Sequence, residues 1–328
     1  MSLSTLVGQP LAKRLLFTAI QRGAVSHGYL FVGPRGAGKT YAARNLAKAL
    51  NCETPTAEGD ACDRCPSCRA IEGGVDAAFR IISGDGPRIK IEQTRALVAD
   101  MALRPDGDRR KVYVIREADR LTPNAANNLL KVLEEPPPYG LLILTTDNPA
   151  TLPATVLSRC QVVPFKPASL PAVTEALVGL TGAPAEQAAQ AAAMSGGVLG
   201  QALDLLRSGR LAERLGLARR AVAVLGRANV LDRIDLLEEM AQYGEDRERL
   251  AEVLGDLAVL YRDSLVLALH PEHHGLSGRA DRDLLAEAAA GYGVPRLFRA
   301  VDRLSRALDG LRRNGQPRLA MEYFVLNV

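Results

Sequence analysis

The segment Gly33–Thr40 has the composition and spacing of a phosphate-binding loop. It reads Gly-Pro-Arg-Gly-Ala-Gly-Lys-Thr, which matches the pattern G-x-x-x-x-G-K-T, and it lies between the apolar run Tyr29–Val32 and the helix-like run Tyr41–Leu50. In such a loop the glycines let backbone N–H groups face phosphate oxygens, while the lysine reaches the outer phosphates and the hydroxyl binds Mg²⁺. The sequence therefore predicts a nucleotide site formed by Gly33, Gly36, Gly38, Lys39 and Thr40.

Four of the five cysteines form a second candidate site. They have the spacing C-x9-C-x2-C-x2-C and are Cys52, Cys62, Cys65 and Cys68, whereas Cys160 stands apart. In an intracellular chain such clustering favours a metal site over disulfides. Four thiolates complete a tetrahedral Zn²⁺ site without an open position, so we expect a structural zinc knuckle over residues 52–68. An iron–sulfur cluster and a loop of reduced cysteines remain alternatives.

Composition limits the classes of protein to which the chain can belong. Its 328 residues suit two or three domains. No apolar run approaches the roughly 20 residues that span a bilayer, and the start of the chain lacks the features of a signal peptide, so we expect a cytoplasmic protein without membrane contact. The net charge of +4 is compatible with nucleic-acid contact but does not argue for it. Without tryptophan and with only 4% aromatics, base-stacking platforms are not expected.

Strand-like and helix-like segments alternate in the first half of the chain, which predicts an α/β fold with a parallel sheet covered on both faces. The strand candidates are Tyr29–Val32, Phe79–Ser83, Lys111–Ile115, Leu141–Thr146 and Gln161–Phe165. After residue 167 strand signals vanish, and the sequence predicts three short helices in 170–207 and a helical bundle in 211–328. Apolar residues at helical spacing are expected to face the core of that bundle: Leu250, Leu254, Leu257, Leu260 and Tyr261.

A second nucleotide element is expected on the strand beside the loop, and the apolar run that ends at Ile115 fits that strand. A hydrolysing ATPase usually follows this strand with two acids, one for Mg²⁺ and one to polarise the attacking water. Here the two positions hold Arg116 and Glu117. Arg116 places positive charge where a carboxylate would hold the cation. Glu117 stays a candidate to act on water and Asp119 a candidate to compensate, although both acids could serve only solubility.

Longer motifs follow these residues. They are Leu6–Gln9, Leu121–Pro137, Leu144–Asp147 and Leu152–Cys160. Together with the loop they resemble the clamp-loader branch of the AAA+ ATPases, the subunits that load the sliding clamp for bacterial DNA polymerase III. The resemblance covers nearly the whole chain and is most specific over residues 6–165. It implies an AAA+ module at 1–167 carrying the zinc knuckle, an all-α lid at 168–208 and an all-α collar at 209–328 that joins subunits into a hetero-oligomeric ring.

The resemblance also implies roles for single residues. Ser158-Arg159-Cys160 matches the motif whose arginine reaches into a neighbouring subunit's ATP site, where Arg159 would stabilise charge at the γ-phosphate. Thr146 matches the position that senses the γ-phosphate. The corresponding sensing arginine of the lid falls at Gly200, where no arginine is present. The chain thus departs from the motor pattern at Arg116 and Gly200, and both departures concern hydrolysis.

Two functions follow from this resemblance. The first is a clamp-loader subunit that binds ATP or ADP with Mg²⁺ weakly or without efficient hydrolysis and supplies Arg159 in trans. The second is a tau/gamma-like motor that turns over its own ATP. In either case the implied partners are the tau/gamma and delta subunits and, through the complex, the sliding clamp and primed DNA, and the chain has no polymerase active site. A small-molecule kinase is disfavoured because nothing supplies an acceptor site.

Overall fold

The computed structural model describes residues 2–84, 86, 88–226, 230–241, 247–273, 276–277, 282–312 and 315–327. The chain divides into two compact units. The first unit comprises Met1–Gly179 and Gly197–Gln201, and the second comprises Leu180–Gly196 and Ala202–Val328. The domain boundaries expected near residues 167 and 208 stay a prediction.

Five described strands of the first unit form one parallel sheet with the order β2-β3-β4-β1-β5. The strands are β1 (Gly28–Val32), β2 (Phe79–Ile82), β3 (Lys111–Ile115), β4 (Gly140–Thr146) and β5 (Gln161–Pro164). Each predicted strand agrees with the structure to within one residue at either end. The strand β3 does not pair with β1, because β4 lies between them and pairs with both. Adjacency in a parallel sheet depends on how the crossovers run, which strand composition does not encode.

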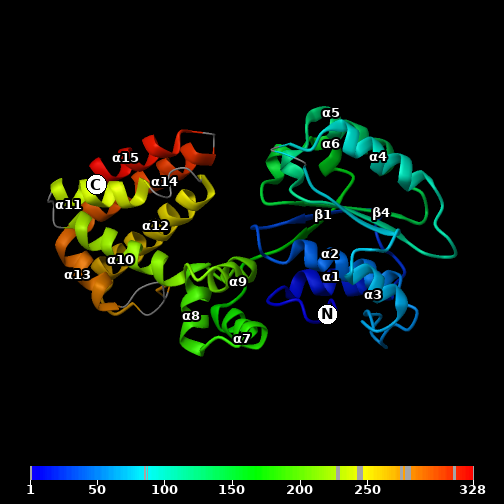
Figure 1. Cartoon of the computed structure of the whole chain (residues 1–328), viewed down its shortest axis with the longest axis horizontal. Coiled ribbons are helices and arrows are strands. Elements are labelled where there is room, and N and C mark those ends of the chain that lie inside the picture. The colour runs from blue at the N-terminus through cyan, green and yellow to red at the C-terminus, as the bar shows by residue number, and fades with distance from the viewer. Residues whose placement is uncertain are drawn as a thin grey trace. The chain divides into compact units, whose positions relative to one another are not determined.

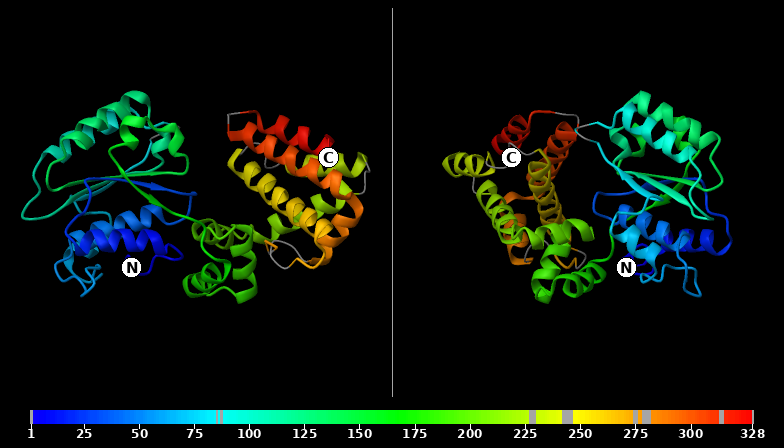
Figure 2. Two further views of the ribbon diagram at one scale, coloured as in Figure 1. Left: turned by 180° about the vertical axis from the view of Figure 1, so that it is seen from behind. Right: turned by 45° about the vertical axis from the view of Figure 1, so that its right-hand side comes forward.

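Helices cover both faces of this sheet (Figures 1 and 2). One face carries α1 (Pro10–Gln21), α2 (Lys39–Leu50) and α3 (Pro66–Glu72). The other carries α4 (Ile91–Ala102), α5 (Pro123–Glu134) and α6 (Ala154–Leu157). Alternate strand residues supply the two cores: Phe31 packs in the first and Leu30 in the second. The predicted α/β fold with a parallel sheet covered on both faces is therefore confirmed, and the phosphate loop follows β1 at the carboxyl edge of the sheet.

The rest of the described chain is helical, as predicted. Its helices are α7 (Leu170–Thr181), α8 (Ala185–Met194), α9 (Leu199–Arg207), α10 (Leu211–Gly226), α11 (Val230–Ala241), α12 (Arg247–Leu269), α13 (Arg282–Tyr292), α14 (Val294–Arg312) and α15 (Pro317–Asn327). The expected apolar face of α12 is buried in the core of the second unit, where Tyr261 packs edge-on against Tyr292 and Phe324. Within the described residues no helix is long and apolar enough to cross a bilayer.

Candidate nucleotide and metal sites

The phosphate loop is held against the carboxyl ends of two neighbouring strands. The N–H group of Gly33 donates to the carbonyl of Thr146, the last residue of β4, at 3.0 Å. Gly38 caps the start of α2 with a φ of 93°, a left-handed conformation that glycine adopts without a steric cost. The first turn of α2 leaves N–H groups without helical partners, and these groups point out of its N-terminus beside the loop. The local backbone therefore has the form that a polyphosphate requires.

The side chain of Lys39 folds back over its own loop. Its amine donates hydrogen bonds to the carbonyls of Gly33 and Pro34, the second at 2.8 Å. Burial lowers the pKa of Lys39, although the charges of Asp147, Asp119 and Glu117 act in the opposite direction. The amine is thus hydrogen-bonded to loop carbonyls, and it would have to break these bonds to contact a phosphate.

Glu117 is held by two arginines. Its carboxylate accepts from Arg35 of the phosphate loop at 3.2 Å and from Arg120 at 2.5 Å. Burial alone would raise the pKa of Glu117, but the hydrogen bond from Arg120 and the charges of Arg35, Arg120 and Arg116 outweigh burial and lower that pKa. A carboxylate with a lowered pKa is a weaker proton acceptor, so this arrangement opposes the role of general base.

The hydroxyl of Thr146 lies at the carboxyl end of β4 and is 1% exposed. It donates to Asp119 at 2.9 Å and accepts from the N–H group of Asn148 at 3.0 Å. Asp119 is thereby bound to the residue expected to sense the γ-phosphate. The loop, Glu117, Asp119 and Thr146, all expected at a nucleotide site, therefore belong to one connected cluster at this edge of the sheet.

A close contact explains why position 200 carries no side chain. The N–H group of Gly200, in the first turn of α9, donates to the carbonyl of Gly36 at 2.9 Å. A Cβ atom at Gly200 would lie 2.7 Å from the Cα atom of Gly36, closer than real carbon contacts. The neighbouring Gln201 side chain donates to the carbonyl of Arg35 at 3.0 Å. An arginine at position 200 is therefore incompatible with this contact between Gly200 and Gly36.

Arg159 lies two residues after the end of α6 and has a separate set of neighbours. Its guanidinium pairs with Glu134, the last residue of α5, at 2.9 Å and donates to the carbonyl of Thr155 at 2.9 Å. The side chain remains 36% exposed. Arg159 is thus oriented by α5 and α6 and still accessible to a group outside this chain.

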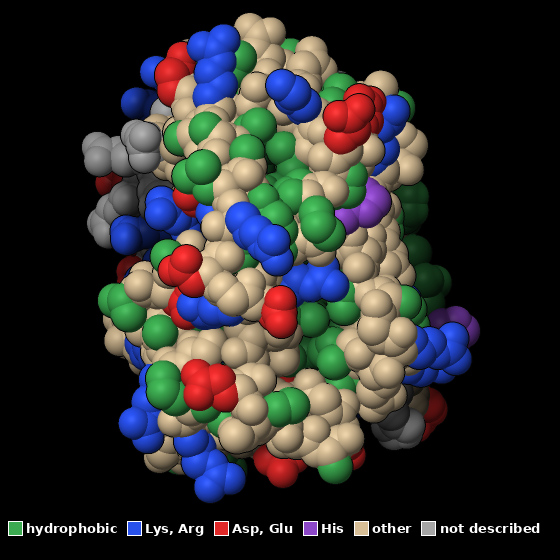
Figure 3. All heavy atoms as spheres, turned by 90° about the vertical axis from the view of Figure 1, so that its right-hand side faces the viewer, with side chains coloured by type: hydrophobic (Ala, Val, Ile, Leu, Met, Phe, Trp, Pro, Cys, Tyr) green, Lys and Arg blue, Asp and Glu red, His purple; other side chains and the backbone are tan. Residues whose placement is uncertain are grey.

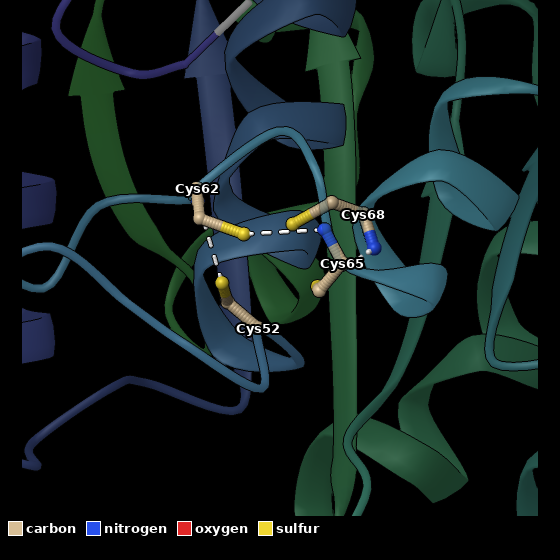
Figure 4. Close-up of side chains that lie close together, drawn as sticks. All are labelled: Cys52, Cys62, Cys65 and Cys68. Carbon is tan, nitrogen blue, oxygen red and sulfur yellow. Dashed lines mark hydrogen bonds between the residues drawn. The ribbon is translucent and has the colours of Figure 1, made fainter.

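The four clustered cysteines come together as the sequence predicts (Figure 4). Their sulfur atoms all lie within 4.8 Å of one another. Four backbone N–H groups also donate to cluster sulfurs: Cys62 to Cys52 at 3.3 Å, Arg64 to Cys62 at 3.5 Å, Cys65 to Cys62 at 3.3 Å and Cys68 to Cys65 at 3.4 Å. In a tetrahedral zinc–thiolate site neighbouring sulfurs are about 3.8 Å apart, so a small contraction would fit the metal.

Hydrogen bonding and burial shift the pKa values of the thiols of this cluster in opposite directions. Hydrogen bonds from Thr54, Arg64 and Cys65 lower the pKa of the Cys62 thiol to about 6. Burial raises the pKa of the Cys68 thiol, and the pKa of the Cys52 thiol is also raised, chiefly by burial. One sulfur is therefore ready to bind a cation near neutral pH, whereas others must first lose a proton.

Several features of these sites were not anticipated from the sequence. The helix α3 begins inside the cysteine segment and was not predicted, although Pro66 at its first position and Cys65 as its N-cap are signals for a helix start. The pairing of Arg35 with Glu117 has no signal in the spacing of either motif.

Figure 3 shows one face on which the described Lys and Arg side chains alternate with Asp and Glu, so charge of one sign does not gather there.

Comparisons with known proteins agree with these motifs. The model of a family described as "DNA polymerase III, delta subunit" matches residues 8–169. The DNA polymerase III subunit delta' of Bacillus subtilis is 32% identical over 80% of this chain and 79% of its own length. The subunit tau of the same organism is 30% identical over 98% of this chain, which spans 60% of that protein. A structure of a DNA polymerase III gamma subunit-related protein from Thermotoga maritima covers 95% of this chain and 97% of its own, with 15% identity and a TM-score of 0.48.

Proposed function

Because this chain belongs to the family of bacterial DNA polymerase III clamp-loader subunits, we propose that it acts in that loader as a delta-prime-like assembly subunit. In this role it grips a nucleotide at the phosphate loop, hydrolyses it poorly, and lends Arg159 to the ATP site of an adjacent subunit. The chemical contribution of the chain is then made to a nucleotide that another subunit holds.

The observation that carries this proposal is the state of Glu117. The loop has the backbone form that a polyphosphate requires, yet Glu117 is neutralised by Arg35 and Arg120. Arg116, at the position where a motor ATPase carries its metal-binding acid, adds a third positive charge nearby. Binding and hydrolysis make different demands on the protein, and these residues support the first while opposing the second.

Arg159 supports the trans role through its accessibility. A guanidinium binds phosphoryl oxygens through two parallel hydrogen bonds and stays charged at all working pH values. Its partner Glu134 is 49% exposed, so the pair is a solvated one whose separation costs little. The guanidinium can therefore exchange Glu134 for a phosphate of the neighbouring subunit.

For the cysteine cluster we propose one structural zinc ion held by Cys52, Cys62, Cys65 and Cys68. Four sulfur ligands favour Zn²⁺ over Mg²⁺ or Ca²⁺, and they leave no position open for water or substrate. The zinc would thus supply folding energy to the segment 52–68 and would not take part in the chemistry. Mg²⁺ would accompany ATP or ADP at the phosphate loop.

The proposed partners are the tau/gamma and delta subunits, in a hetero-oligomer joined by the helical domain after residue 208. Through that complex the chain would meet the sliding clamp and primed DNA in the cytoplasm. The alternative is a tau/gamma-like motor, which the match to tau over 98% of this chain favours. The two functions differ in one measurable property, the ATP turnover of the isolated chain.

The decisive experiment compares steady-state ATP hydrolysis by the isolated chain, by the partner subunits alone and by the reconstituted loader. We expect negligible turnover by the isolated chain and a marked rise in loader turnover when it is added. The matched variants are Lys39→Ala, which removes the loop amine, and Lys131→Ala, which removes an exposed amine of α5 as a control. Brisk turnover by the isolated chain, lost in Lys39→Ala and kept in Lys131→Ala, would establish the motor instead.

A further inference from the structure

The cysteine cluster is not an isolated lobe, because Asp60 ties it to the N-terminal turn of the chain. The Asp60 carboxylate is 3% exposed and accepts three backbone hydrogen bonds, from Leu3 at 3.0 Å, Ser4 at 3.0 Å and Ala61 at 2.8 Å. Ala61 directly precedes the ligand Cys62. A buried carboxylate with three charge-assisted bonds fixes the groups that it joins, since leaving any of them unpaired is costly.

The N-terminal turn in its place supports the phosphate loop. Leu3 and Leu6 are buried, and the N–H group of Leu6 donates to the carbonyl of Leu3 at 3.1 Å. A methyl carbon of Leu6 lies 3.0 Å from the position that a Cβ atom on Gly38 would take, so this leucine packs against the residue that caps α2. The hydroxyl of Thr5 is 2.6 Å from that of Tyr41, in the first turn of α2. Lys39 and Thr40 therefore lie between two residues that this turn holds.

A second link joins the cysteine segment to the far end of the same helix. Lys48 of α2 is 1% exposed, and its amine pairs with Asp63 at 2.5 Å and with Glu72 at 2.8 Å. Asp63 stands between the ligands Cys62 and Cys65, and Glu72 ends α3. A fully buried amine with two carboxylate partners holds its helix firmly, because removing one partner leaves an uncompensated buried charge.

From these contacts we propose that metal at the four cysteines and nucleotide at the phosphate loop bind cooperatively, with Asp60 and Lys48 as the positioning residues. This inference rests on the proposed metal and nucleotide sites. The metal fixes the backbone of residues 52–68. The hydrogen bonds of Asp60 then hold residues 3–6 in place, and the packing of Leu6 holds Gly38 in place. Coupling between two sites is reciprocal, so nucleotide strengthens metal binding by the same factor by which metal strengthens nucleotide binding.

The test uses the full chain in its zinc-loaded form and after chelation under reducing conditions. The probes are zinc content, the affinity for a fluorescent ADP with Mg²⁺, and hydrogen exchange at residues 3–6 and 36–42. On removal of zinc we expect roughly tenfold weaker ADP binding, within the usual 5- to 150-fold range of such couplings, and faster exchange in both segments. Zinc loss that leaves exchange at residues 36–42 unchanged overturns the proposal.

Variants separate the coupling from simple loss of metal. Asp60→Asn keeps the size of the side chain but weakens the three backbone bonds, and Lys48→Met removes the second link. Glu58→Gln is the matched control, because Glu58 is exposed and only two residues from Asp60. We expect Asp60→Asn and Lys48→Met to retain zinc and yet bind ADP more weakly, with fast exchange at residues 36–42, whereas Glu58→Gln behaves as the parent chain. Parental ADP affinity and exchange in both variants would refute the coupling.

The exchange measurement also separates this inference from the proposed function. If no form binds ADP, the nucleotide site fails, while zinc-dependent exchange at residues 36–42 still supports the mechanical link. If the parent chain binds ADP and its affinity ignores zinc, the nucleotide site stands and the cooperativity fails. A chain that takes up no zinc at all disproves the cooperativity as well.

Discussion

Arg35 and Glu117 form an ion pair of 3.2 Å that joins the phosphate loop to the residue expected to activate water. The two residues are far apart in the sequence and meet because β4 brings the ends of β1 and β3 to the same edge of the sheet. The loop thus supplies, from within the same chain, the positive charge that neutralises the candidate base.

Restoring acidic character at this edge should increase hydrolysis. In the double variant Arg35→Ala/Arg116→Asp, Glu117 loses one of its arginine partners and the metal gains a carboxylate. We expect Mg²⁺-dependent ATP turnover by the isolated chain to rise by about tenfold or more, since general-base catalysis contributes about 10²–10⁴-fold and Arg120 still pairs with Glu117. A phosphate-release assay measures it. Adding Lys39→Ala must abolish the gain, and an unchanged rate despite retained ATP binding would show that Glu117 is not the limiting group.

Lys39→Ala should weaken nucleotide binding without unfolding the chain. The amine makes no ion pair among those recorded for the described residues, and its bonds to loop carbonyls are local, so little stability depends on it. A charge-assisted contact to phosphate contributes about 1.5–3 kcal/mol, which corresponds to roughly 10- to 150-fold in affinity. Titration with fluorescent ADP tests this, with thermal unfolding as the control. Equal affinity in both proteins would place the nucleotide elsewhere.

Arg159→Ala should reduce ATP hydrolysis by the reconstituted loader by about 10³-fold, the usual contribution of an arginine supplied in trans. Arg159→Lys should recover only part of that rate, because an ammonium does not bind two phosphoryl oxygens in parallel. Glu134→Gln serves as the comparison, since it leaves the guanidinium in place and removes its resting partner. Steady-state rates decide the matter, and a fully active Arg159→Ala loader would rule out the trans role.

Gly200→Ala should destabilise the first unit by about 1–3 kcal/mol, the usual cost of forcing an extra methyl group into a packed site. The new Cβ atom would meet the Gly36 backbone at 2.7 Å. Gly179→Ala in α7 is the matched control, because no atom lies within 4 Å of its added Cβ. That variant should be neutral or slightly more stable, as alanine favours helices over glycine. Urea unfolding measures both, and equal midpoints would contradict the contact.

Zinc binding should strengthen as pH rises from 6 to 8 and should release protons. The Cys62 thiol, with a pKa of about 6, is largely ionised at neutral pH, whereas the raised pKa values of Cys52 and Cys68 keep those thiols protonated. Each proton that the metal displaces makes its affinity increase with pH. Competition with a zinc-sensitive dye at several pH values measures the slope. Elemental analysis should find about one zinc per chain, and Cys65→Ser should lose it.

The sequence predicted the elements of this fold better than their arrangement. The strand Lys111–Ile115 was predicted to the residue, because a strand buried on both faces is a short apolar run with clear ends. Its neighbours in the sheet were not predicted, because periodicity reports what a segment is and not where it lies. Likewise the cysteine spacing predicted the cluster, whereas the links through Asp60 and Lys48 depend on tertiary contacts between distant segments.

Because Lys48 is buried, the reactivity of its amine reports whether the cysteine segment is folded. Its amine pairs with two carboxylates, and its side chain is 1% exposed. Acetylating and other amine-reactive reagents should therefore modify surface lysines and leave Lys48 unmodified. Once the cysteine segment opens, the same amine becomes nucleophilic and available. Mass-spectrometric labelling at this one position would therefore measure the fraction of molecules in which the segment has opened.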